Sequence, residues 1–321
     1  MSVAAHETNK QVCILGSGTM GGQMALALAA ASTKVALWGR RHEGLEGAQA
    51  RIVSDLRFLV EMGVLSEAES RARSSRIVTA TDLAQALDGA DVVLEAIVEQ
   101  VELKQELLCR VEQHVGADAV LASTTSAISP STLQQPLKYP DRFVVTHFIQ
   151  PAHLMELVEV VPGRQTREAV THSVVAWLHQ AGKRPLLCPD IPGFLFARIQ
   201  HVLLREFVSL VEQGHVTPEL CDAIMKDGYA ARLPAMGCFE HADLAGLDLI
   251  DSGPAREVWA DLNCCDSPAK TLVGALKAAG QLGMRTGSGF YDWKARDAEK
   301  FKRNRDEQIV RSNLSKRSPE P

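Results

Sequence analysis

The sequence predicts an α/β protein with two domains: a mainly parallel sheet covered by helices, followed by an all-helical domain. Short apolar segments alternate with helical patterns through residues 1–190, and this alternation is typical of strand–helix–strand units in a parallel sheet. From residue 195 onward, long helical patterns dominate. We therefore expect a sheet-containing domain at 1–190 and a helical domain at 191–321, joined at the Pro- and Gly-containing segment 189–194.

The first expected elements are a strand, a glycine-rich turn and a helix. The apolar run 12–15 predicts a buried strand, and the Ala- and Leu-rich run 23–31 predicts a helix. Three glycines between them have the spacing G-x-G-x-x-G, which permits a tight turn, a close approach of the backbone to a pyrophosphate, and phosphate binding at the helix N-terminus. This segment therefore predicts a Rossmann-type, dinucleotide-binding domain. The residues expected at the cofactor here are Gly16, Gly18, Thr19, Met20 and Gly21.

The next expected strand, 34–38, ends at Gly39, Arg40 and Arg41. In NAD-binding domains an acidic residue about 20 positions beyond the glycines binds the ribose hydroxyls of adenosine. Gly39 stands in its place, and a guanidinium group binds a 2′-phosphate through paired hydrogen bonds. The strand end therefore favours NADP(H), with Arg40 and Arg41 as its ligands. NAD(H) is the alternative if both arginines are solvated surface charges.

Further strands and helices follow along the chain. Helices are expected at 44–62 and from Ser66, a predicted N-cap residue, and a polar, charged tail follows Trp293. Expected strands are 76–78, 91–96, 119–122, 143–146 and 157–160, and expected helices of the second domain are 199–211, 218–226 and 266–282. The apolar stretches 202–211 and 244–250 exceed what a small helical domain buries alone, so we expect a homodimer.

Composition favours a cytoplasmic enzyme with a small-molecule substrate. The 321 residues are 46% hydrophobic and carry a formal net charge of −5, which gives no reason to expect nucleic-acid binding. No apolar run reaches the roughly 18 to 20 residues of a membrane span, and residues 1–10 lack the apolar core of a signal peptide. The cysteines have no C-x-x-C spacing, which favours reduced thiols and predicts no metal site. They are Cys13, Cys109, Cys188, Cys221, Cys238, Cys264 and Cys265.

A series of longer motifs carries a family resemblance. In order they are GSGTMG, EAIVEQVELKQELL, ASTTSAIS, RFVVTHFIQPAHLMELVEVVPG, DIPGF, LVEQGHVTPELCDAIMKDGY, MGCFEHADLAGLD and RTGSGFYDW. Over residues 10–295 the chain resembles the 3-hydroxyacyl-CoA dehydrogenase family. It is nearer the small-substrate members, such as the gulonate 3-dehydrogenase (lambda-crystallin) and pyridine-carboxylate dehydrogenase types. The resemblance implies a Rossmann-type domain, a helical dimerisation domain, and hydride transfer between a 3-hydroxy carbon and a nicotinamide.

The resemblance places the catalytic residues at His147, Glu159 and Ser126. Imidazole titrates near working pH and can take a hydroxyl proton as hydride leaves, and a carboxylate partner would orient the ring. Ser126 matches a serine that binds the substrate oxygen, although a turn or N-cap serine is the alternative. His153 lies near the same motif, where a surface loop histidine is favoured over a residue of the substrate pocket.

Further cofactor contacts follow from the resemblance alone. They are Glu99, Lys104, Gln150 and Arg285. Without the family, Glu99 and Lys104 would read as solvated charges, because a spacing of five does not align side chains on a helix.

Departures from the family pattern concern the substrate. Ala197 replaces the asparagine of P-G-F-x-x-N-R, and Gln150 replaces the asparagine of H-F-x-N-P. The helix end 59–64 has no lysine for a polyanionic CoA. Arg232 matches an arginine of the gulonate-type relatives, where it would suit a free carboxylate; a surface salt bridge is the alternative.

We therefore expect an NAD(P)-dependent alcohol dehydrogenase or ketone reductase of the EC 1.1.1 type. It would prefer NADP(H) and act on a small polar 3-hydroxy or 3-keto substrate, with Ala197 and Arg232 at the substrate. One alternative is a true short-chain 3-hydroxyacyl-CoA dehydrogenase. Another is a crystallin-like structural or binding protein, against which the retained acid–base pair argues.

Overall fold

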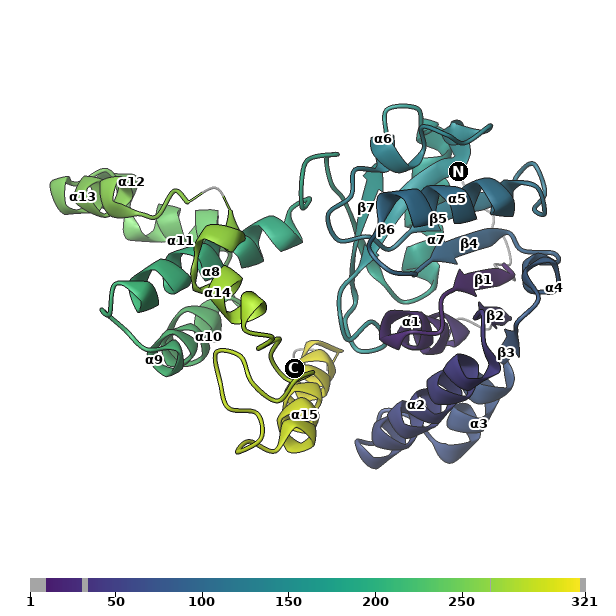
Figure 1. Cartoon of the computed structure of the whole chain (residues 1–321), viewed down its shortest axis with the longest axis horizontal. Coiled ribbons are helices and arrows are strands. Elements are labelled where there is room, and N and C mark those ends of the chain that lie inside the picture. Colours follow the sequence, from purple (N-terminus) through teal and green to yellow (C-terminus); the bar gives the residue numbers. More distant parts are fainter. Residues whose placement is uncertain (1–9, 31–33, 266, 318–321) are drawn as a thin grey trace. The chain divides into compact units, whose positions relative to one another are not determined.

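The computed structural model describes residues 10–30, 34–265 and 267–317, which form two compact units (Figure 1). Unit 1 comprises the residues up to Ala197 together with those from Arg303 onward, and unit 2 comprises Arg198–Lys302. The expected second domain, 191–321, differs from unit 2 at its C-terminal end. Residues 303–317 belong to unit 1 because their helix packs on its core.

Unit 1 is built on one twisted sheet. In the described part of the chain its strands are β1 Val12–Leu15, β2 Val35–Trp38, β3 Ile77–Ala80, β4 Val92–Glu95, β5 Val120–Ser123, β6 Phe143–Phe148, β7 Leu157–Pro162 and β8 Arg184–Leu187. Their order is β3-β2-β1-β4-β5-β6-β7-β8. Strands β1 to β6 are parallel, β7 is antiparallel to β6, and β8 is parallel to β7. The predicted Rossmann-type fold is confirmed, and the strand order reverses between β1 and β4, where such sheets bind ligands.

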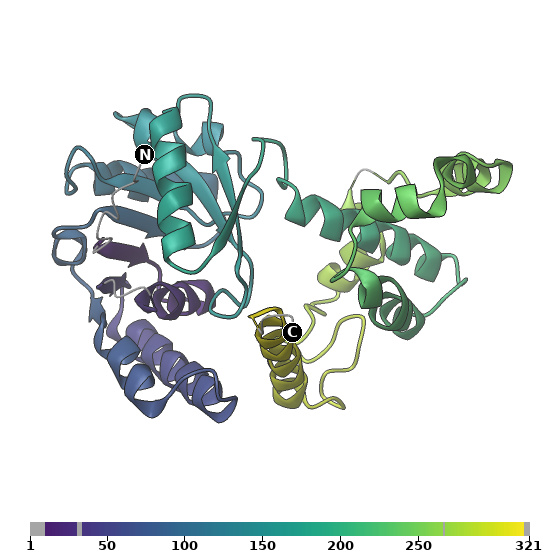
Figure 2. The ribbon, with the colours of Figure 1, turned by 180° about the vertical axis from the view of Figure 1, so that it is seen from behind.

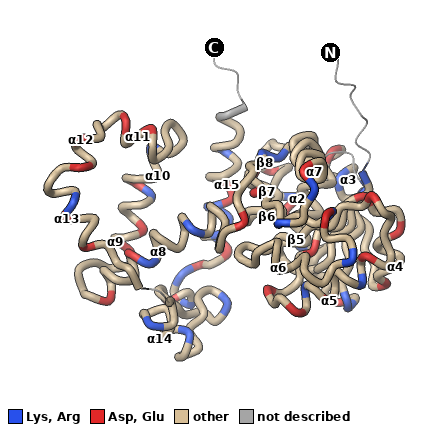
Figure 3. The backbone as a smooth tube through the Cα atoms, turned by 90° about the horizontal axis from the view of Figure 1, so that it is seen from above, with Lys and Arg blue, Asp and Glu red and all other residues tan. Residues whose placement is uncertain are grey.

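Helices cover both faces of this sheet. They are α1 Thr19–Ala29, α2 His42–Glu61, α3 Glu67–Ser75, α4 Leu83–Leu87, α5 Val101–Glu112, α6 Pro130–Leu133, α7 Glu168–Gln180 and α15 Ala298–Arg317. Because successive strand residues point to opposite faces, Val12 and Ile14 pack with α1, α2 and α7, whereas Cys13 and Leu15 pack with α4, α5 and α6. In the rear view the teal helix α7 lies against its face of the sheet (Figure 2). Acidic and basic residues are interspersed along the outer helices (Figure 3).

The expected helix starts and ends in unit 1 agree with the structure to within a few residues. Ser66 caps α3 as predicted, because its hydroxyl accepts from the backbone N–H of Glu69 at 3.2 Å while the Glu69 carboxylate accepts from the N–H of Ser66 at 2.8 Å. The prediction about a signal peptide falls on residues 1–9, which lie outside the described residues.

The polar, charged segment after Trp293 contains a long helix. The helix α15 runs from Ala298 to Arg317 and returns to unit 1. There Val310 is buried in the core, and the Asn313 side-chain amide donates to the Leu154 carbonyl at 2.8 Å. Its sequence is strongly polar, so a single buried valine is too weak a pattern to predict the packing.

Unit 2 is helical, as predicted for the second domain. Its elements are the main part of α8 Phe196–Glu212, then α9 Pro218–Ala223, the π-helical turn Ile224–Tyr229, α10 Ala230–Arg232, α11 Cys238–Ala245, α12 Leu247–Ile250, α13 Gly253–Asp261 and α14 Leu272–Ala278. The expected helix 266–282 is too long: Pro268–Lys270 is a separate 3-10 turn, Thr271 caps α14, and Gly280 follows its end with φ of +72°. Asp266 lies outside the described residues.

Many large apolar side chains of unit 2 are exposed. Phe239 is 89% exposed, Leu244 73% and Trp259 71%. Among the described residues, no helix is long and apolar enough to span a bilayer. Large exposed apolar patches are typical of surfaces that contact another molecule.

Candidate active site

The glycine-rich turn lies between β1 and α1. Gly16 has φ of +129°, and a Cβ there would stand 2.5 Å from the carbonyl oxygen of Ala96. A Cβ on Gly21 would overlap the carbonyl oxygen of Gly16. Gly18 is the N-cap of α1 and has no side chain to satisfy the first helical N–H groups, so the backbone at Thr19 and Met20 is suited to phosphate oxygens.

The end of β2 has no room for an acidic side chain in the observed arrangement. A Cβ on Gly39 would lie 2.8 Å from Ser17 Oγ and 3.0 Å from a methyl group of Leu45. Arg40 and Arg41 follow, both exposed, and Arg41 is the N-cap residue of α2. Two clustered cations and a helix N-terminus therefore stand beside the glycine-rich turn.

His147 and Glu159 face each other across the antiparallel pair β6 and β7. His147 Nδ1 and Glu159 Oε2 are 2.7 Å apart, and both residues are buried. The other carboxylate oxygen of Glu159 accepts the backbone N–H groups of Leu195 and Phe196, each at 2.9 Å. Glu159 is thus fixed by β7, by β6 and by the start of α8, and it fixes the imidazole in turn.

The surroundings of this pair favour an ionised carboxylate. Burial by itself would raise the pKa of Glu159, but the hydrogen bonds from His147, Phe196 and Leu195 outweigh it and lower that pKa. The rings of Phe194 and Phe196 lie 6.0 and 6.3 Å from the imidazole, centroid to centroid. Burial, followed by the charge of Glu159, raises the pKa of the nearby Cys188 thiol to about 11, so the thiol stays neutral. The carboxylate therefore fixes the orientation of the imidazole ring.

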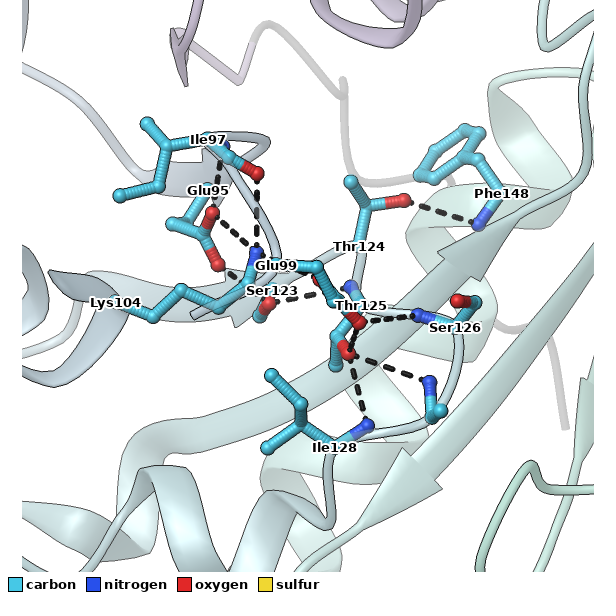
Figure 4. Close-up of polar contacts among 11 residues, drawn as sticks. Glu95, Ile97, Glu99, Lys104, Ser123, Thr124, Thr125, Ser126, Ile128 and Phe148 are labelled. Atoms are coloured by element: carbon cyan, nitrogen blue, oxygen red, sulfur yellow. Dashed lines mark hydrogen bonds and ion pairs between the residues drawn. The ribbon is translucent and has the colours of Figure 1, made fainter. Parts of the chain in front are cut away.

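A second polar cluster lies at the ends of β4 and β5 (Figure 4). Lys104 is only 1% exposed, and its ammonium contacts Glu95 at 2.7 Å and Glu99 at 3.2 Å. The reading of Lys104 as a solvated charge is therefore wrong, because its main partner is nine residues away, on a strand, and the pair is buried.

The loop after β5 is tied to both clusters (Figure 4). The Glu99 carboxylate accepts the Thr125 hydroxyl and, at 3.3 Å, the backbone N–H of Ser126. The Thr124 hydroxyl accepts the backbone N–H of Phe148 at 3.3 Å, directly after His147. The exposed Ser126 side chain is therefore presented at the same edge of the sheet as His147.

Of three further expected residues, Gln150 and Ala197 adjoin the elements that hold the His147–Glu159 pair, and Arg285 lies in unit 2. Gln150 is exposed at the end of the β6 segment, and Ala197 is buried in the first turn of α8. Arg285 is exposed in unit 2, which is described separately from unit 1.

Arg232 lies in unit 2 at the end of α10. Its guanidinium lies 2.7 Å from His241 Nε2 and 5.6 Å from the centre of the Tyr229 ring. Within the described ranges none of its contacts is with a carboxylate.

His153 is not a surface loop histidine. Its side chain is 2% exposed, and its Nε2 lies 3.9 Å from Asp55. Burial, followed by the charges of Lys183 and Arg305, lowers the pKa of His153 to about 4. It lines a cavity of about 310 Å³ beside α15, away from the His147 pair, because the returning helix covers what would otherwise be an exposed loop.

Several residues of the site were not predicted. Glu95, Ser123 and Thr125 join Glu99 and Lys104, and Ser17 fills the space beside Gly39. Glu95 carried one signal: a charged residue that ends an otherwise apolar strand needs a buried partner. The partner itself could not be predicted from spacing.

The turn, the free helix N-terminus and the buried acid–base pair define the class of a dinucleotide-dependent oxidoreductase. Sequence profiles agree: the 3-hydroxyacyl-CoA dehydrogenase NAD binding domain matches residues 11–191, and the C-terminal domain of the same enzymes matches residues 193–293. The chain belongs to the 3-hydroxyacyl-CoA dehydrogenase family, and its first domain is the NAD-binding domain of that family.

Curated relatives match this chain over only part of their own length. Subunit alpha of the fatty acid oxidation complex of Pseudomonas entomophila (strain L48) is 32% identical over 308 residues, which is 95% of this chain and 42% of that protein. The chain thus spans about two fifths of the length of such curated relatives.

This chain matches two solved structures over nearly the whole length of those structures. The NAD+-dependent dismutase 5-formyl-3-hydroxy-2-methylpyridine 4-carboxylic acid 5-dehydrogenase has a TM-score of 0.88 and 27% identity, covering 97% of this chain and 99% of that one. The (S)-3-hydroxybutyryl-CoA dehydrogenase of Ralstonia eutropha has a TM-score of 0.72 and 31% identity, with coverage of 89% and 99%.

Proposed function

We propose that this protein transfers a hydride between NADP(H) and a small polar 3-hydroxy or 3-keto substrate. The observation that carries the proposal is the buried His147–Glu159 pair, 2.7 Å apart, at the sheet edge that also bears the glycine-rich turn. A structural protein has no need for a buried titratable pair beside a dinucleotide site. The pair therefore argues against the crystallin-like alternative.

The residues of unit 1 divide the chemistry between them. When bound, the nicotinamide supplies or accepts the hydride. His147 takes the hydroxyl proton during oxidation, or returns it during reduction, while Glu159 stabilises the charged ring. Ser126, held through its backbone by Glu99, donates a hydrogen bond to the substrate oxygen on which negative charge develops.

The preference for NADP(H) is supported by the end of β2. Gly39 offers no carboxylate to repel a 2′-phosphate, and Arg40, Arg41 and the N-terminus of α2 offer positive charge. The 27%-identical dismutase is NAD+-dependent, so NADH is the competing cofactor in every test.

The substrate class is supported by what the chain lacks. Ala197 cannot donate the hydrogen bond of the family asparagine, Gln150 lengthens another polar position, and the end of α2 at Leu59–Glu61 carries no lysine for CoA phosphates. Arg232, paired with His241 rather than with an acid, suits a substrate carboxylate.

A second candidate is a true short-chain 3-hydroxyacyl-CoA dehydrogenase, which the 31%-identical 3-hydroxybutyryl-CoA enzyme favours. Oxidation or formation of NADPH and NADH with acetoacetyl-CoA and with small keto acids separates the two. The proposal expects poor turnover of acetoacetyl-CoA, improved by Ala197→Asn without benefit to the keto acid. A kcat/KM of about 10⁴ M⁻¹s⁻¹ or above on acetoacetyl-CoA would establish the second candidate instead.

A further inference from the structure

The carboxylate of Glu95 is the most buried charge of unit 1 and lies outside the acid–base pair. It ends β4, and its side chain is 0% exposed. One oxygen accepts from Lys104 Nζ and from the backbone N–H of Ile97, each at 2.7 Å. The other accepts from the Ser123 hydroxyl at 2.5 Å.

These contacts join three elements that carry the expected cofactor and substrate residues (Figure 4). Lys104 on α5 reaches onward to Glu99 at 3.2 Å. Ser123 on β5 accepts the backbone N–H of Thr125 at 3.2 Å, and the Thr125 hydroxyl donates to Glu99. Two routes therefore run from Glu95 to the loop that presents Ser126, one through Lys104 and Glu99 and one through Ser123.

The glycine-rich turn is tied to the same point of the sheet. Ala96, directly after Glu95, donates its N–H to the Leu15 carbonyl at 2.8 Å. A Cβ on Gly16 would stand 2.5 Å from the Ala96 carbonyl oxygen. A displacement of the segment after β4 would therefore be transmitted to the turn that binds the pyrophosphate.

Stability alone gives little reason for such an arrangement. A buried ion pair contributes weakly to stability, and apolar residues of similar size often do as well or better. A carboxylate with donors on both oxygens does, however, fix the directions of those donors.

We propose that Glu95 is a positioning residue for hydride transfer: through Lys104 and Ser123 it holds Glu99 and the Ser126 loop in register with the glycine-rich turn. The inference rests on the proposed function. It assigns Glu95 no contact with substrate or cofactor and no proton transfer. Its effect is exerted on the geometry of groups that make those contacts, where small displacements are costly.

The test compares Glu95→Gln and Glu95→Asp with the full-length wild type. Aspartate keeps the charge but withdraws both oxygens from Lys104 and Ser123, whereas glutamine keeps the length and removes the charge. Each is expected to lower kcat/KM about 10- to 100-fold and to raise the Kd of NADPH, measured by fluorescence titration, at a temperature where thermal melts show the variant folded. Wild-type kcat/KM and Kd in Glu95→Asp would overturn the inference.

A double-mutant cycle with Lys104→Met tests the route. If Glu95 acts partly through Lys104, Glu95→Gln costs much less in the Lys104→Met background than in the wild type. The double variant also removes both charges, so it stays folded even where Glu95→Gln leaves an unpaired ammonium. Independent, additive losses would overturn a role through Lys104.

Arg142→Gln is the matched control. Arg142 is a buried cation of the same unit at the opposite end of the sheet, where it donates to the backbone carbonyls of Ala117 and Ala119, just before β5. It should lower the melting temperature and leave kcat/KM unchanged, whereas an equal loss of kcat/KM would make the Glu95 effect one of general stability. If the wild type shows no dinucleotide-dependent turnover, the proposed function itself is refuted.

Discussion

The two units of this protein differ in how much of their apolar surface is buried. Unit 1 buries apolar residues on both faces of one sheet, and its two most buried carboxylates are paired: Glu95 with Lys104, and Glu159 with His147. Unit 2 leaves large apolar side chains such as Phe239 and Trp259 exposed. The core of unit 1 is closed by its own helices, whereas unit 2 exposes apolar surface of the kind that often contacts another molecule.

Because of this difference, we expect substitutions in unit 1 and in unit 2 to affect catalysis and oligomeric mass separately. The catalytic and cofactor groups of unit 1 are positioned by its own strands and helices, so changes there should alter chemistry without altering mass. We propose that a second copy of the chain covers the apolar surface of unit 2. Substitutions on that surface of unit 2 should lower the oligomeric mass before they affect catalysis.

The largest expected effect is in unit 1. His147→Ala should lower turnover about 10²- to 10⁴-fold, because it removes the positioned acid–base group, while NADPH binding and oligomer mass stay unchanged. Steady-state kinetics, fluorescence titration and light scattering measure the three quantities. His172→Ala is the control, since His172 is an exposed histidine of α7 beside Glu168. Near-normal turnover by His147→Ala would refute the catalytic assignment.

The next effect belongs to unit 2. The wild type should be dimeric at micromolar concentration, and Trp259→Glu combined with Phe239→Glu should raise the dimer Kd by about 10³-fold, since two buried aromatic anchors of about 2 kcal/mol each are lost. Sedimentation over a concentration series measures it. Val53→Glu, at a half-exposed valine of α2 in unit 1, should leave the mass unchanged. A monomeric wild type would contradict the proposed assembly.

The comparison also explains what was predictable from sequence. Local patterns located the strands β1 to β7, the glycine-rich turn and the cap at Ser66, because each depends on neighbouring residues. The strand β8 was not predicted. The meeting of His147 with Glu159 depends on strand register, which sequence spacing alone does not provide; the family motif supplied both residues.

What escaped prediction depends on distant contacts. Spacing alone suggested that Lys104 is solvated. In the structure, the pairing of β4 with β5 and the packing of α5 place Lys104 against Glu95. His153 looked exposed until α15 returned to unit 1. Lys104 is buried because α5 packs on the nearby strand β4, whereas His153 is buried by a helix from the other end of the chain.

A smaller effect concerns the cofactor site of unit 1. Arg40→Ala should weaken NADPH binding by about 1 to 3 kcal/mol, the worth of a charge-assisted contact, and leave NADH binding unchanged. Titration of both cofactors measures it. Arg57→Ala, at another exposed arginine on α2, is the control for the loss of one positive charge. Tighter or equal binding of NADH by the wild type would overturn the NADP(H) preference.

The smallest expected effect is on the acid stability of unit 1. Although burial alone would raise it, the pKa of Glu159 lies below 4.5 in the folded protein because of the hydrogen bonds from His147, Phe196 and Leu195. A carboxyl group whose pKa is lowered by folding adds stability above its unfolded pKa and loses that stability as pH falls through the folded value. The wild type should therefore exceed Glu159→Gln in unfolding free energy at pH 7, by an amount that shrinks below pH 4.5.

Asp55 titrates with the opposite sign but does not disturb this last measurement. Burial, then the charge of Asp306, raises the pKa of Asp55 to about 6, so its ionisation costs stability above that pH and protonation removes the cost. Because Asp55 is present in both proteins, its contribution cancels in the difference between them. Urea unfolding of the wild type and Glu159→Gln from pH 7 down to pH 3.5 measures that difference, and a value that stays constant across this range would show that the His147 pair does not hold Glu159 ionised.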